Sequence, residues 1–222
     1  MTSHPPRIEA LLRYVVYGSL VAVLGCAKDG DNADDTPEPA APFELDLELD
    51  GAVVHLVAGA SGFVFVPGSQ GDCNMGITVC ANYQESVVSD SVDVNDRWRV
   101  GMIKTFQDLG GSLPSPDSVN TMVSLGSYPF GKFVWNSTTS QYHIVDGVRI
   151  QWTDPSGVEW STDRGAADQS ASVFTVAEKV STGEIFGPRY TFKCSFNCVL
   201  YNGTGESKGV SAGYLFGPII IG

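Results

Sequence analysis

Hydrophobic and polar residues alternate with a period of two through much of this chain. The clearest stretch is Phe43 to Asp50, where apolar Phe and Leu residues take turns with Glu and Asp. This period places successive side chains on opposite faces of a β-strand, so we expect one solvated face and one buried face. Segments that alternate in this way or are short and apolar predict further strands at 52–57, 63–66, 86–94, 98–106, 132–135, 142–145, 148–153, 158–162, 172–180, 189–201 and 213–221.

Glycine and proline separate these segments. Asp154-Pro155-Ser156-Gly157 and Asn202-Gly203 have the composition of tight turns, and Pro67-Gly68 is expected to end a strand. The stretch from Pro114 to Ser124 differs, because its apolar residues fall at helical spacing behind capping residues, and it predicts one short helix. Many short strands with almost no helix indicate an all-β fold, an antiparallel β-sandwich or a barrel-like variant of it.

The N-terminal segment has a different pattern. Two arginines precede an uncharged apolar run from Tyr14 to Leu24. At about 11 residues the run is too short for a membrane-spanning helix, which needs roughly 20, and is typical of a secretory signal peptide over residues 1–25. Val23-Leu24-Gly25-Cys26 resembles the lipobox of bacterial lipoproteins, which implies cleavage before Cys26, acylation of Cys26 and a lipid anchor in the membrane. An ordinary signal peptide is the alternative.

Residues 26–42 are acidic, rich in Ala and Pro, and contain no aromatic residue. Such a composition buries too little apolar surface to offset chain entropy, so we expect a disordered linker. Its spaced aspartates do not form an EF-hand calcium loop, because Ala33 stands at a ligand position and no Glu closes the loop. Lys28-Asp29 and the acids that follow resemble the signal that sends Bacteroidetes lipoproteins to the cell surface, which implies an outer-membrane protein, periplasmic or surface-exposed.

Length and charge restrict the remaining possibilities. Residues 43–222 have the size of a single domain, expected to be the β-sandwich. The chain has 13 Lys and Arg against 25 Asp and Glu, a net charge of −12 at pH 7. This charge repels phosphate backbones and argues against nucleic-acid binding. It also disfavours anionic membrane surfaces, so the lipid on the N-terminal cysteine must supply the attachment.

Four cysteines follow Cys26, in a compartment that permits disulfides. Cys73 and Cys80 flank a plausible turn and are the candidates for a local disulfide. Cys194 and Cys198 lie four residues apart in one predicted strand, about 13 Å, which is too far for a disulfide without breaking the strand. They are expected to be buried as small hydrophobic residues. A zinc site is the alternative, but the spacings between these cysteines are not those of common zinc sites.

Five segments of the C-terminal half carry a family resemblance: Leu125–Gly131, Gly147–Asp154, Gly157–Thr162, Ser172–Val176 and Phe192–Tyr201. In this order they are similar to a group of Bacteroidetes surface or periplasmic lipoproteins of uncharacterised function. The resemblance implies an all-β domain behind a lipobox. It implies no catalytic residues, because none is assigned in that group.

No residue pattern predicts a catalytic centre. His55 and His143 have no acid or second histidine at metal-ligand spacing, and both are expected to be structural. A Gly-x-Ser-x-Gly sequence occurs at Gly209–Gly213, but a predicted strand follows it instead of the helix of a nucleophile elbow. A glycosidase needs two facing carboxylates, but Asp154 and Glu159 flank a predicted turn and are expected to be solvated. We therefore expect no enzymatic activity, no metal and no cofactor, with a glycan hydrolase as the least favoured alternative.

Aromatic residues in the predicted strands are the candidates for ligand binding. Trp135, Tyr142, Trp152 and Trp160 could stack on sugar rings, although the two tryptophans on either side of the 154–157 turn also suit cross-strand packing. We expect the protein to bind a glycan or a protein partner. A purely structural or adhesive surface protein is the alternative. The exposure of these four aromatic rings discriminates between the two hypotheses, because a buried aromatic ring cannot stack on a ligand.

Overall fold

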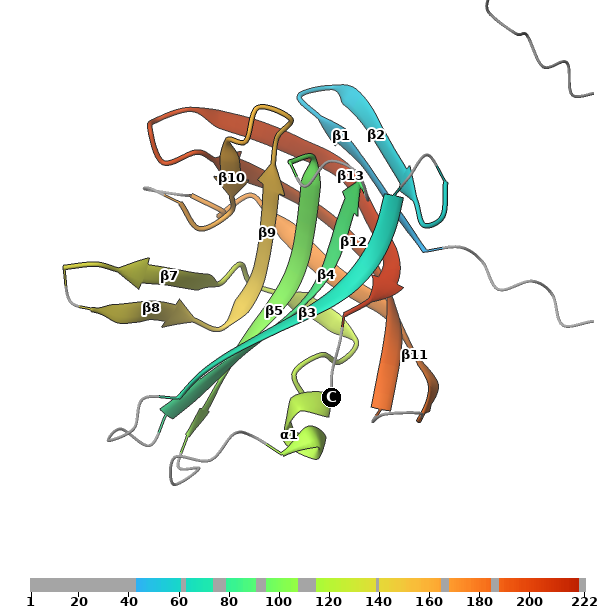
Figure 1. Ribbon diagram of the computed structural model, residues 1–222, viewed down its shortest axis with the longest axis vertical. Coiled ribbons are helices and arrows are strands. Elements are labelled where there is room, and N and C mark those ends of the chain that lie inside the picture. The colour runs from blue at the N-terminus through green and yellow to red at the C-terminus, as the bar shows by residue number, and fades with distance from the viewer. Residues whose placement is uncertain are drawn as a thin grey trace, which may run out of the picture. The chain divides into compact units, whose positions relative to one another are not determined.

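A computed structural model describes residues 43–60, 63–73, 79–90, 95–107, 115–138, 140–164, 168–184 and 188–219, and these residues form an antiparallel β structure with one short helix (Figure 1). The strands are β1 (Glu44–Leu49), β2 (Ala52–Val57), β3 (Phe63–Cys73), β4 (Val79–Asp90), β5 (Arg97–Gln107), β6 (Gly126–Tyr128), β7 (Lys132–Asn136), β8 (Gln141–Val145), β9 (Gly147–Thr153), β10 (Glu159–Ser161), β11 (Val173–Glu184), β12 (Pro188–Tyr201) and β13 (Ser207–Pro218). The helix is α1 (Pro116–Asn120). The all-β prediction is confirmed.

Eleven of the strands form one sheet. Its order is β2-β1-β13-β12-β10-β9-β5-β4-β3, and β11 pairs with both β12 and β6. The long strand β12 has β13 along one edge, and its other edge is shared by β11 and, at Tyr201, by β10. Every pairing between the named strands is antiparallel, as expected when consecutive strands are joined by short turns.

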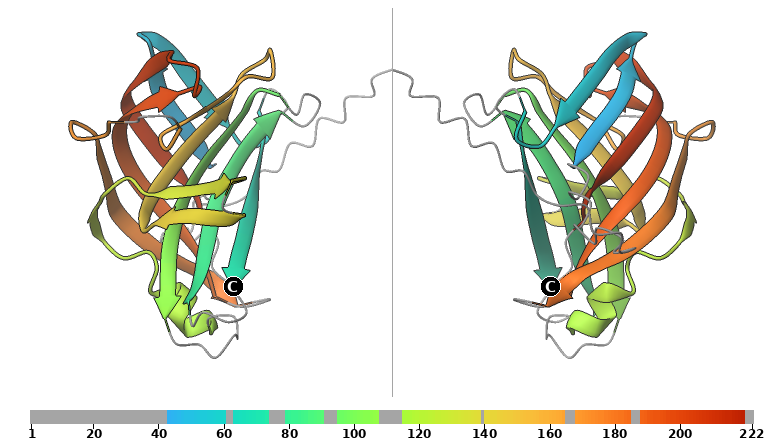
Figure 2. Two further views of the ribbon diagram at one scale, coloured as in Figure 1. Left: turned by 90° about the vertical axis from the view of Figure 1, so that its left-hand side faces the viewer. Right: turned by 90° about the vertical axis from the view of Figure 1, so that its right-hand side faces the viewer.

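The sheet curls until its edge strand β3 approaches β13 and the start of β1 (Figure 2). Phe65 of the edge strand β3 packs against Gly217 of β13, where a Cβ atom would lie 2.9 Å from the ring. The rings of Phe43 and Phe65 lie 5.9 Å apart between centroids, and the hydroxyl of Ser86 on β4 donates a hydrogen bond to the carbonyl of Pro218. The sheet is therefore nearly closed, which corresponds to the barrel-like form of the expected architecture.

One hydrophobic core fills the concave side of this sheet, because alternate side chains of each strand point inward. Its largest fully buried members are Trp98, Phe174, Phe192, Leu45, Met102, Ile150, Leu200, Leu215, Ile219 and Val88. They come from β1, β4, β5, β9, β11, β12 and β13, and from the residue that follows β13. The predicted period of two is therefore the alternation between this core and the outer surface.

The predicted 154–157 turn is confirmed, whereas some strand ends differ between the prediction and the structure. In the 154–157 turn the Gly157 amide donates a 2.8 Å hydrogen bond to the Asp154 carbonyl, and Gly157 has a φ of +84°. Pro67-Gly68, however, does not end β3, which continues to Cys73. β3 is the last strand of the sheet, and an edge position tolerates a proline that cannot donate to a neighbouring strand. The sequence pattern does not predict the short strand β6.

A separate hairpin, β7–β8, packs across the outside of the sheet (Figure 2). Phe133 of β7 and Ile103 of β5 form a small second core with Tyr142 and Ile144 of β8. Ile103 follows the main-core residue Met102, so it points to the opposite face of β5. The hairpin therefore covers part of the outer surface of the curved sheet.

Two glycines hold the base of this hairpin against β9. The Gly131 amide donates to the Val148 carbonyl and the Val148 amide donates to the Pro129 carbonyl, both at 2.8 Å. A Cβ on Gly131 would lie 2.4 Å from the Val145 carbonyl oxygen, and one on Gly147 would lie 2.4 Å from the Pro129 carbonyl oxygen. Only residues without a side chain allow the two backbone segments to meet this closely.

Within the described ranges, no helix has the length and apolar character needed to cross a bilayer.

Candidate functional site

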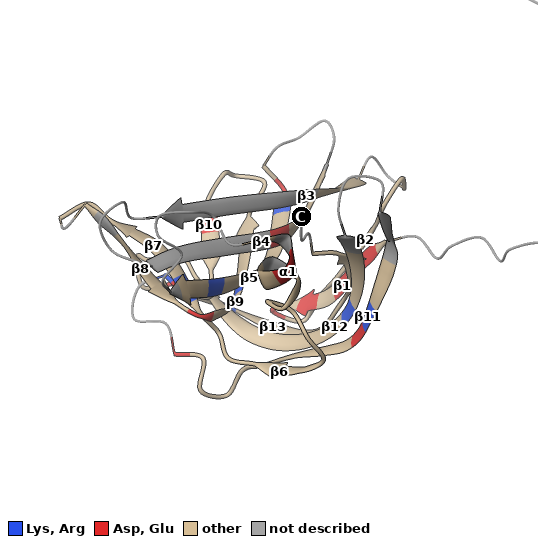
Figure 3. Ribbon diagram, turned by 90° about the horizontal axis from the view of Figure 1, so that it is seen from below, with Lys and Arg blue, Asp and Glu red and all other residues tan. Residues whose placement is uncertain are grey.

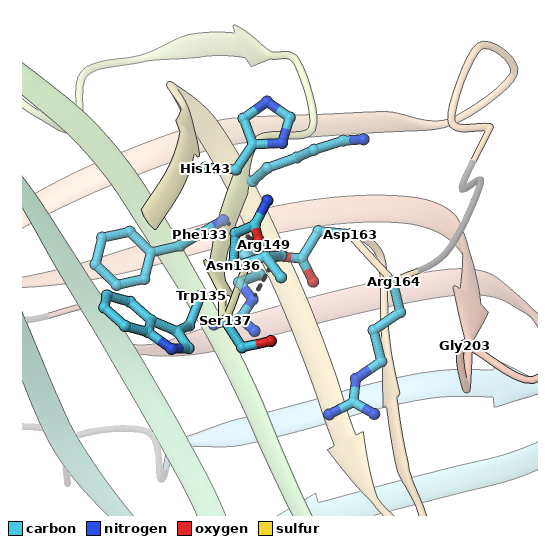
Figure 4. A pocket seen from close by; sticks show the side chains of 11 residues that line it. Phe133, Trp135, Asn136, Ser137, His143, Arg149, Asp163, Arg164 and Gly203 are labelled. Atoms are coloured by element: carbon cyan, nitrogen blue, oxygen red, sulfur yellow. Dashed lines mark hydrogen bonds and ion pairs between the residues drawn. The ribbon is translucent and has the colours of Figure 1, made fainter. Parts of the chain in front are cut away.

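A cleft of about 640 Å³ lies along β7, beside the segment that follows β10 (Figure 4). This volume falls within the roughly 300–1,000 Å³ typical of small-molecule sites. Two smaller hollows formed by described residues, of about 250 and 290 Å³, contain no tryptophan. The cleft is lined by Lys132, Phe133, Val134, Trp135, Asn136, Ser137, His143, Arg149, Asp163, Arg164 and Gly203.

A fully buried carboxylate joins the two walls of the cleft. Asp163, whose side chain is 0% exposed, pairs with Nε of Arg149 on β9 at 2.9 Å. The same carboxylate accepts a 3.1 Å hydrogen bond from the backbone amide of Phe133 on β7 and one from the hydroxyl of Ser161. Charged hydrogen bonds of this kind are short and directional. Asp163 therefore fixes the position of β7 relative to β9 and β10.

A second arginine lies at the opposite side of the cleft from Trp135 (Figure 4). Nη2 of Arg164 lies 2.7 Å from Oε1 of Glu159, and the amide of Gln151 also donates to this oxygen at 2.9 Å. A guanidinium has five N–H donors, and the contact with Glu159 engages only one end of it. Arg164 can therefore bind a ligand group while Glu159 holds its side chain in place.

Trp135 is the exposed aromatic residue of the cleft. Its side chain is 52% exposed and lies directly across the hairpin from Tyr142, with the rings 5.0 Å apart at an angle of 66°. Tyr142 in turn packs 4.7 Å from Phe133, which is buried. This row of rings orients the Trp135 indole while leaving much of its surface open. Of the four aromatic residues expected to stack on a ligand, Trp135 has the accessible ring.

The other two predicted tryptophans have a structural environment. Trp98, Trp152 and Trp160 form a row across β5, β9 and β10, with ring centroids 5.5 and 6.4 Å apart. The indole N–H of Trp152 donates to Asp96 at 3.0 Å, and that of Trp160, only 6% exposed, donates to Asp154 at 3.1 Å. These rings stabilise the sheet by cross-strand packing and are not part of the cleft.

Both carboxylates near the 154–157 turn form structural contacts rather than being simply solvated as expected. Partial burial opposes ionisation of Asp154, but hydrogen bonds from Ser156, Trp160 and the Val158 amide outweigh it and lower the pKa of this carboxyl. Glu159 is bound by Arg164 and Gln151. Neither arrangement resembles the facing pair of carboxyl groups that glycoside hydrolysis uses.

The two histidines lie in different places. His143 is exposed and lines the cleft, across the hairpin from Val134. His55 has an acidic neighbour that sequence spacing did not indicate, because the β1–β2 register places Asp46 opposite it. The His55 ring donates to the Asp46 carboxylate, and this hydrogen bond raises the pKa of His55. Among the described residues, no three His, Cys, Asp or Glu side chains come together in a way that could hold a metal ion.

The cysteines divide into two pairs. Cys194 and Cys198 are free and buried in the main core, as expected from their spacing in one strand, and burial raises the pKa of Cys194 to about 12 and that of Cys198 further. Cys73 and Cys80 are directly opposite each other in the β3–β4 register, which is compatible with a disulfide, but their side chains lie outside the described residues. Cys26 also lies outside them.

Thiol labelling should distinguish the two pairs. In native protein at pH 8 we expect iodoacetamide to leave Cys194 and Cys198 unmodified, because a buried thiol with a raised pKa forms almost no thiolate. In urea without reductant both should react, whereas Cys73 and Cys80 should react only after reduction. Peptide mass spectrometry reads out each site. Labelling of Cys73 or Cys80 before reduction would rule out the disulfide.

Comparisons with protein-family models, with curated proteins and with solved structures found no match to this chain.

The sequence predicts the aromatic side of the cleft but not the side formed by charged residues. Strand composition predicts Trp135, which lines the cleft, and Tyr142, which packs against it, but it does not predict Arg149, Asp163 or Arg164. Asp163 follows Arg149 by fourteen positions and Phe133 by thirty, as residue numbers show, and no short motif links them. A weak signal is present in the alternation of β9, where Arg149 stands between the core residues Val148 and Ile150 and so must point away from the core.

Proposed function

We propose that this protein is a lipid-anchored envelope protein that binds a saccharide in the β7 cleft and does not catalyse a reaction on it. The observation that supports saccharide binding most directly is the open face of Trp135 on the wall of a cleft of suitable volume. An aromatic ring offers an apolar surface to the C–H face of a sugar, and the polar lining offers donors to its hydroxyl groups. The ionised groups of the 154–157 turn are engaged in structural contacts, which supports a binding role over hydrolysis.

The anchor in this proposal comes from the N-terminal sequence. The apolar run before Cys26 and the acidic linker after it resemble the leader of bacterial lipoproteins, in particular those of Bacteroidetes. Stable attachment requires more than one acyl chain, and an acylated lipobox cysteine would carry several. The protein would then lie at the outer membrane, facing the periplasm or the medium.

Replacing Cys26 with alanine is expected to release the protein from the membrane. The variant should lose incorporated fatty-acid label and move from the membrane fraction to the soluble fraction, because the acidic protein itself has little affinity for anionic headgroups. Metabolic labelling with an alkyne fatty acid and fractionation measure both effects. An alanine variant that keeps the label and the membrane location would contradict lipidation at this residue.

Screening on a glycan array followed by titration tests saccharide binding. For any glycan that binds, Trp135→Ala is expected to weaken the affinity at least about tenfold, equivalent to about 1.4 kcal/mol of lost stacking. The control is Leu125→Ala, which removes another exposed apolar side chain that does not line the cleft. Bound ligand should also protect Trp135 fluorescence from acrylamide. An array without any signal would favour a structural or adhesive protein instead.

A further inference from the structure

Basic side chains gather on one wall of this acidic protein. Arg97 and Arg99 of β5 and Arg149 of β9 project from the same outer face, because Arg149 is opposite Gly101 in the register and their even-numbered neighbours are in the core. Figure 3 shows this basic region on β5 and β9. The β1 strand, by contrast, points acidic side chains outward at Glu44, Asp46 and Glu48. An anionic ligand would be repelled from β1 and attracted to the wall that bears the cleft.

The cleft itself has an excess of positive charge. Its lining contains three cationic side chains, those of Lys132, Arg149 and Arg164, and a single carboxylate, that of Asp163. Asp163 is fully buried and bound by Arg149, Ser161 and the amide of Phe133. Its charge is therefore neutralised inside the protein, and the groups that a ligand would meet at the surface are predominantly cationic.

Two cations are available on different elements around the cleft. Lys132 begins β7, and no carboxylate of the described residues lies within salt-bridge distance of its ammonium group. Arg164 follows β10 and uses one end of its guanidinium for Glu159, which is not part of the lining. Because the buried Asp163 holds β7 beside this segment, the spacing between the two cations is set by the fold rather than by flexible loops.

We propose that the saccharide bound in the cleft is an acidic one, with carboxylate or sulfate groups that bind Lys132 and Arg164 while a sugar ring lies against Trp135. This inference rests on the proposed saccharide binding. A neutral sugar would leave Lys132 without a partner, whereas an anionic group forms charge-assisted hydrogen bonds with both cations. Arg97 lies on the same face beyond the cleft, where Arg99 is paired with Glu85 at 3.7 Å. A chain with repeated acidic groups would gain further attraction there from Arg97.

Four probes of matched length test the ligand class by titration calorimetry on the full protein. They are hexagalacturonate, its fully methyl-esterified form, a heparin hexasaccharide and hexaglutamate. We expect the carboxylated or the sulfated saccharide to bind at least about tenfold tighter than the ester, as loss of one charged hydrogen bond predicts. Raising NaCl from about 0.1 M to about 1 M, which shortens the Debye length from ~10 to ~3 Å, should remove most of this preference.

Charge variants test whether Lys132 and Arg164 cause the preference for an acidic saccharide. Lys132→Gln and Arg164→Gln are each expected to weaken the acidic saccharide about five- to tenfold and to leave binding of the ester unchanged. The matched control is Lys193→Gln, which changes the net charge equally but lies on β12 outside the cleft, paired with Glu178. Circular dichroism spectra and urea unfolding curves verify that each variant is folded. A control that weakens binding as much as the cleft variants would overturn the assignment of Lys132 and Arg164.

The remaining outcomes separate this inference from the proposed function. Equal binding of the acid and the ester, with loss of both in Trp135→Ala, would overturn the acidic class and support saccharide binding. Hexaglutamate that binds as tightly as the acidic saccharides would indicate a general polyanion or acidic-peptide site and overturn the saccharide assignment. Absence of binding by every probe and every arrayed glycan would overturn both proposals.

Discussion

Replacing Gly147 with alanine is expected to lower the free energy of unfolding by about 3–5 kcal/mol, a large part of the roughly 5–15 kcal/mol of a typical domain. Gly147 has a φ of +142°, a backbone conformation that residues with a Cβ rarely adopt. The added Cβ would also lie 2.4 Å from the Pro129 carbonyl oxygen and 2.7 Å from the Gly131 nitrogen. These are backbone atoms, so relief requires separation of the hairpin base from β9. Urea unfolding monitored by circular dichroism measures the loss.

Gly51→Ala is the matched control for this substitution. Gly51 also has a positive φ, +82°, but no atom lies within 4 Å of the position that its Cβ would take. Its replacement should therefore cost only the conformational strain of about 1–2 kcal/mol. If Gly147→Ala destabilises the protein no more than Gly51→Ala, the close backbone contact at the hairpin base contributes nothing and this account of the hairpin is wrong. Loss of saccharide binding in Gly147→Ala would further connect the hairpin base to the cleft.

Asp163→Ala is expected to destabilise the protein by about 3–5 kcal/mol, the usual result of removing one partner of a buried ion pair. The substitution leaves Arg149, whose side chain is only 13% exposed, without this carboxylate, and it removes the acceptor of the Phe133 amide. The replacement of both partners together, Asp163→Leu with Arg149→Met, should recover much of the stability because no unpaired charge remains. A double-mutant cycle from urea unfolding curves gives the coupling energy.

The exposed ion pair of Glu159 and Arg164 is the internal comparison for the buried one. Both of its side chains are more than a third exposed, so Glu159→Gln should change the free energy of unfolding by at most about 1 kcal/mol. A small effect of Asp163→Ala, similar to that of Glu159→Gln, would show that the carboxylate does not connect β7 with β9. In that case the arrangement of the cleft would have to depend on the apolar contacts of Phe133 and on the backbone contacts at the hairpin base.

The proposed saccharide site and the structural role of the hairpin are connected by the two substitutions Gly147→Ala and Asp163→Ala. The hairpin has only a small core of its own, formed by Phe133, Ile103, Tyr142 and Ile144. Its position on the sheet therefore depends on the glycine contacts at its base and on Asp163 at its edge. A cleft built between a rigid sheet and a hairpin fixed at two points presents Trp135 and the cations without an ordering cost on binding.

Much of the fold follows from local patterns in the sequence. Phe43 to Asp50 could be assigned to a strand because the period of two is imposed by the strand geometry itself. The 154–157 turn could be assigned because Asp, Pro and Gly each favour particular backbone angles there. The burial of Cys194 and Cys198 followed from their spacing in one strand. The end of β3 could not be predicted, since Pro67 is tolerated only because that strand lies at the edge of the sheet.

The sequence by itself determined that this protein is an all-β chain, where most of its strands and turns lie, and that its net charge is strongly negative. These properties depend on residues within a few positions of one another or on composition alone. Only the tertiary structure decided that Trp135 is exposed while Trp160 is buried, and that Lys132, Asp163 and Arg164 surround one cleft. These features depend on sheet closure and on the packing of the hairpin, which bring together residues that are far apart in the chain.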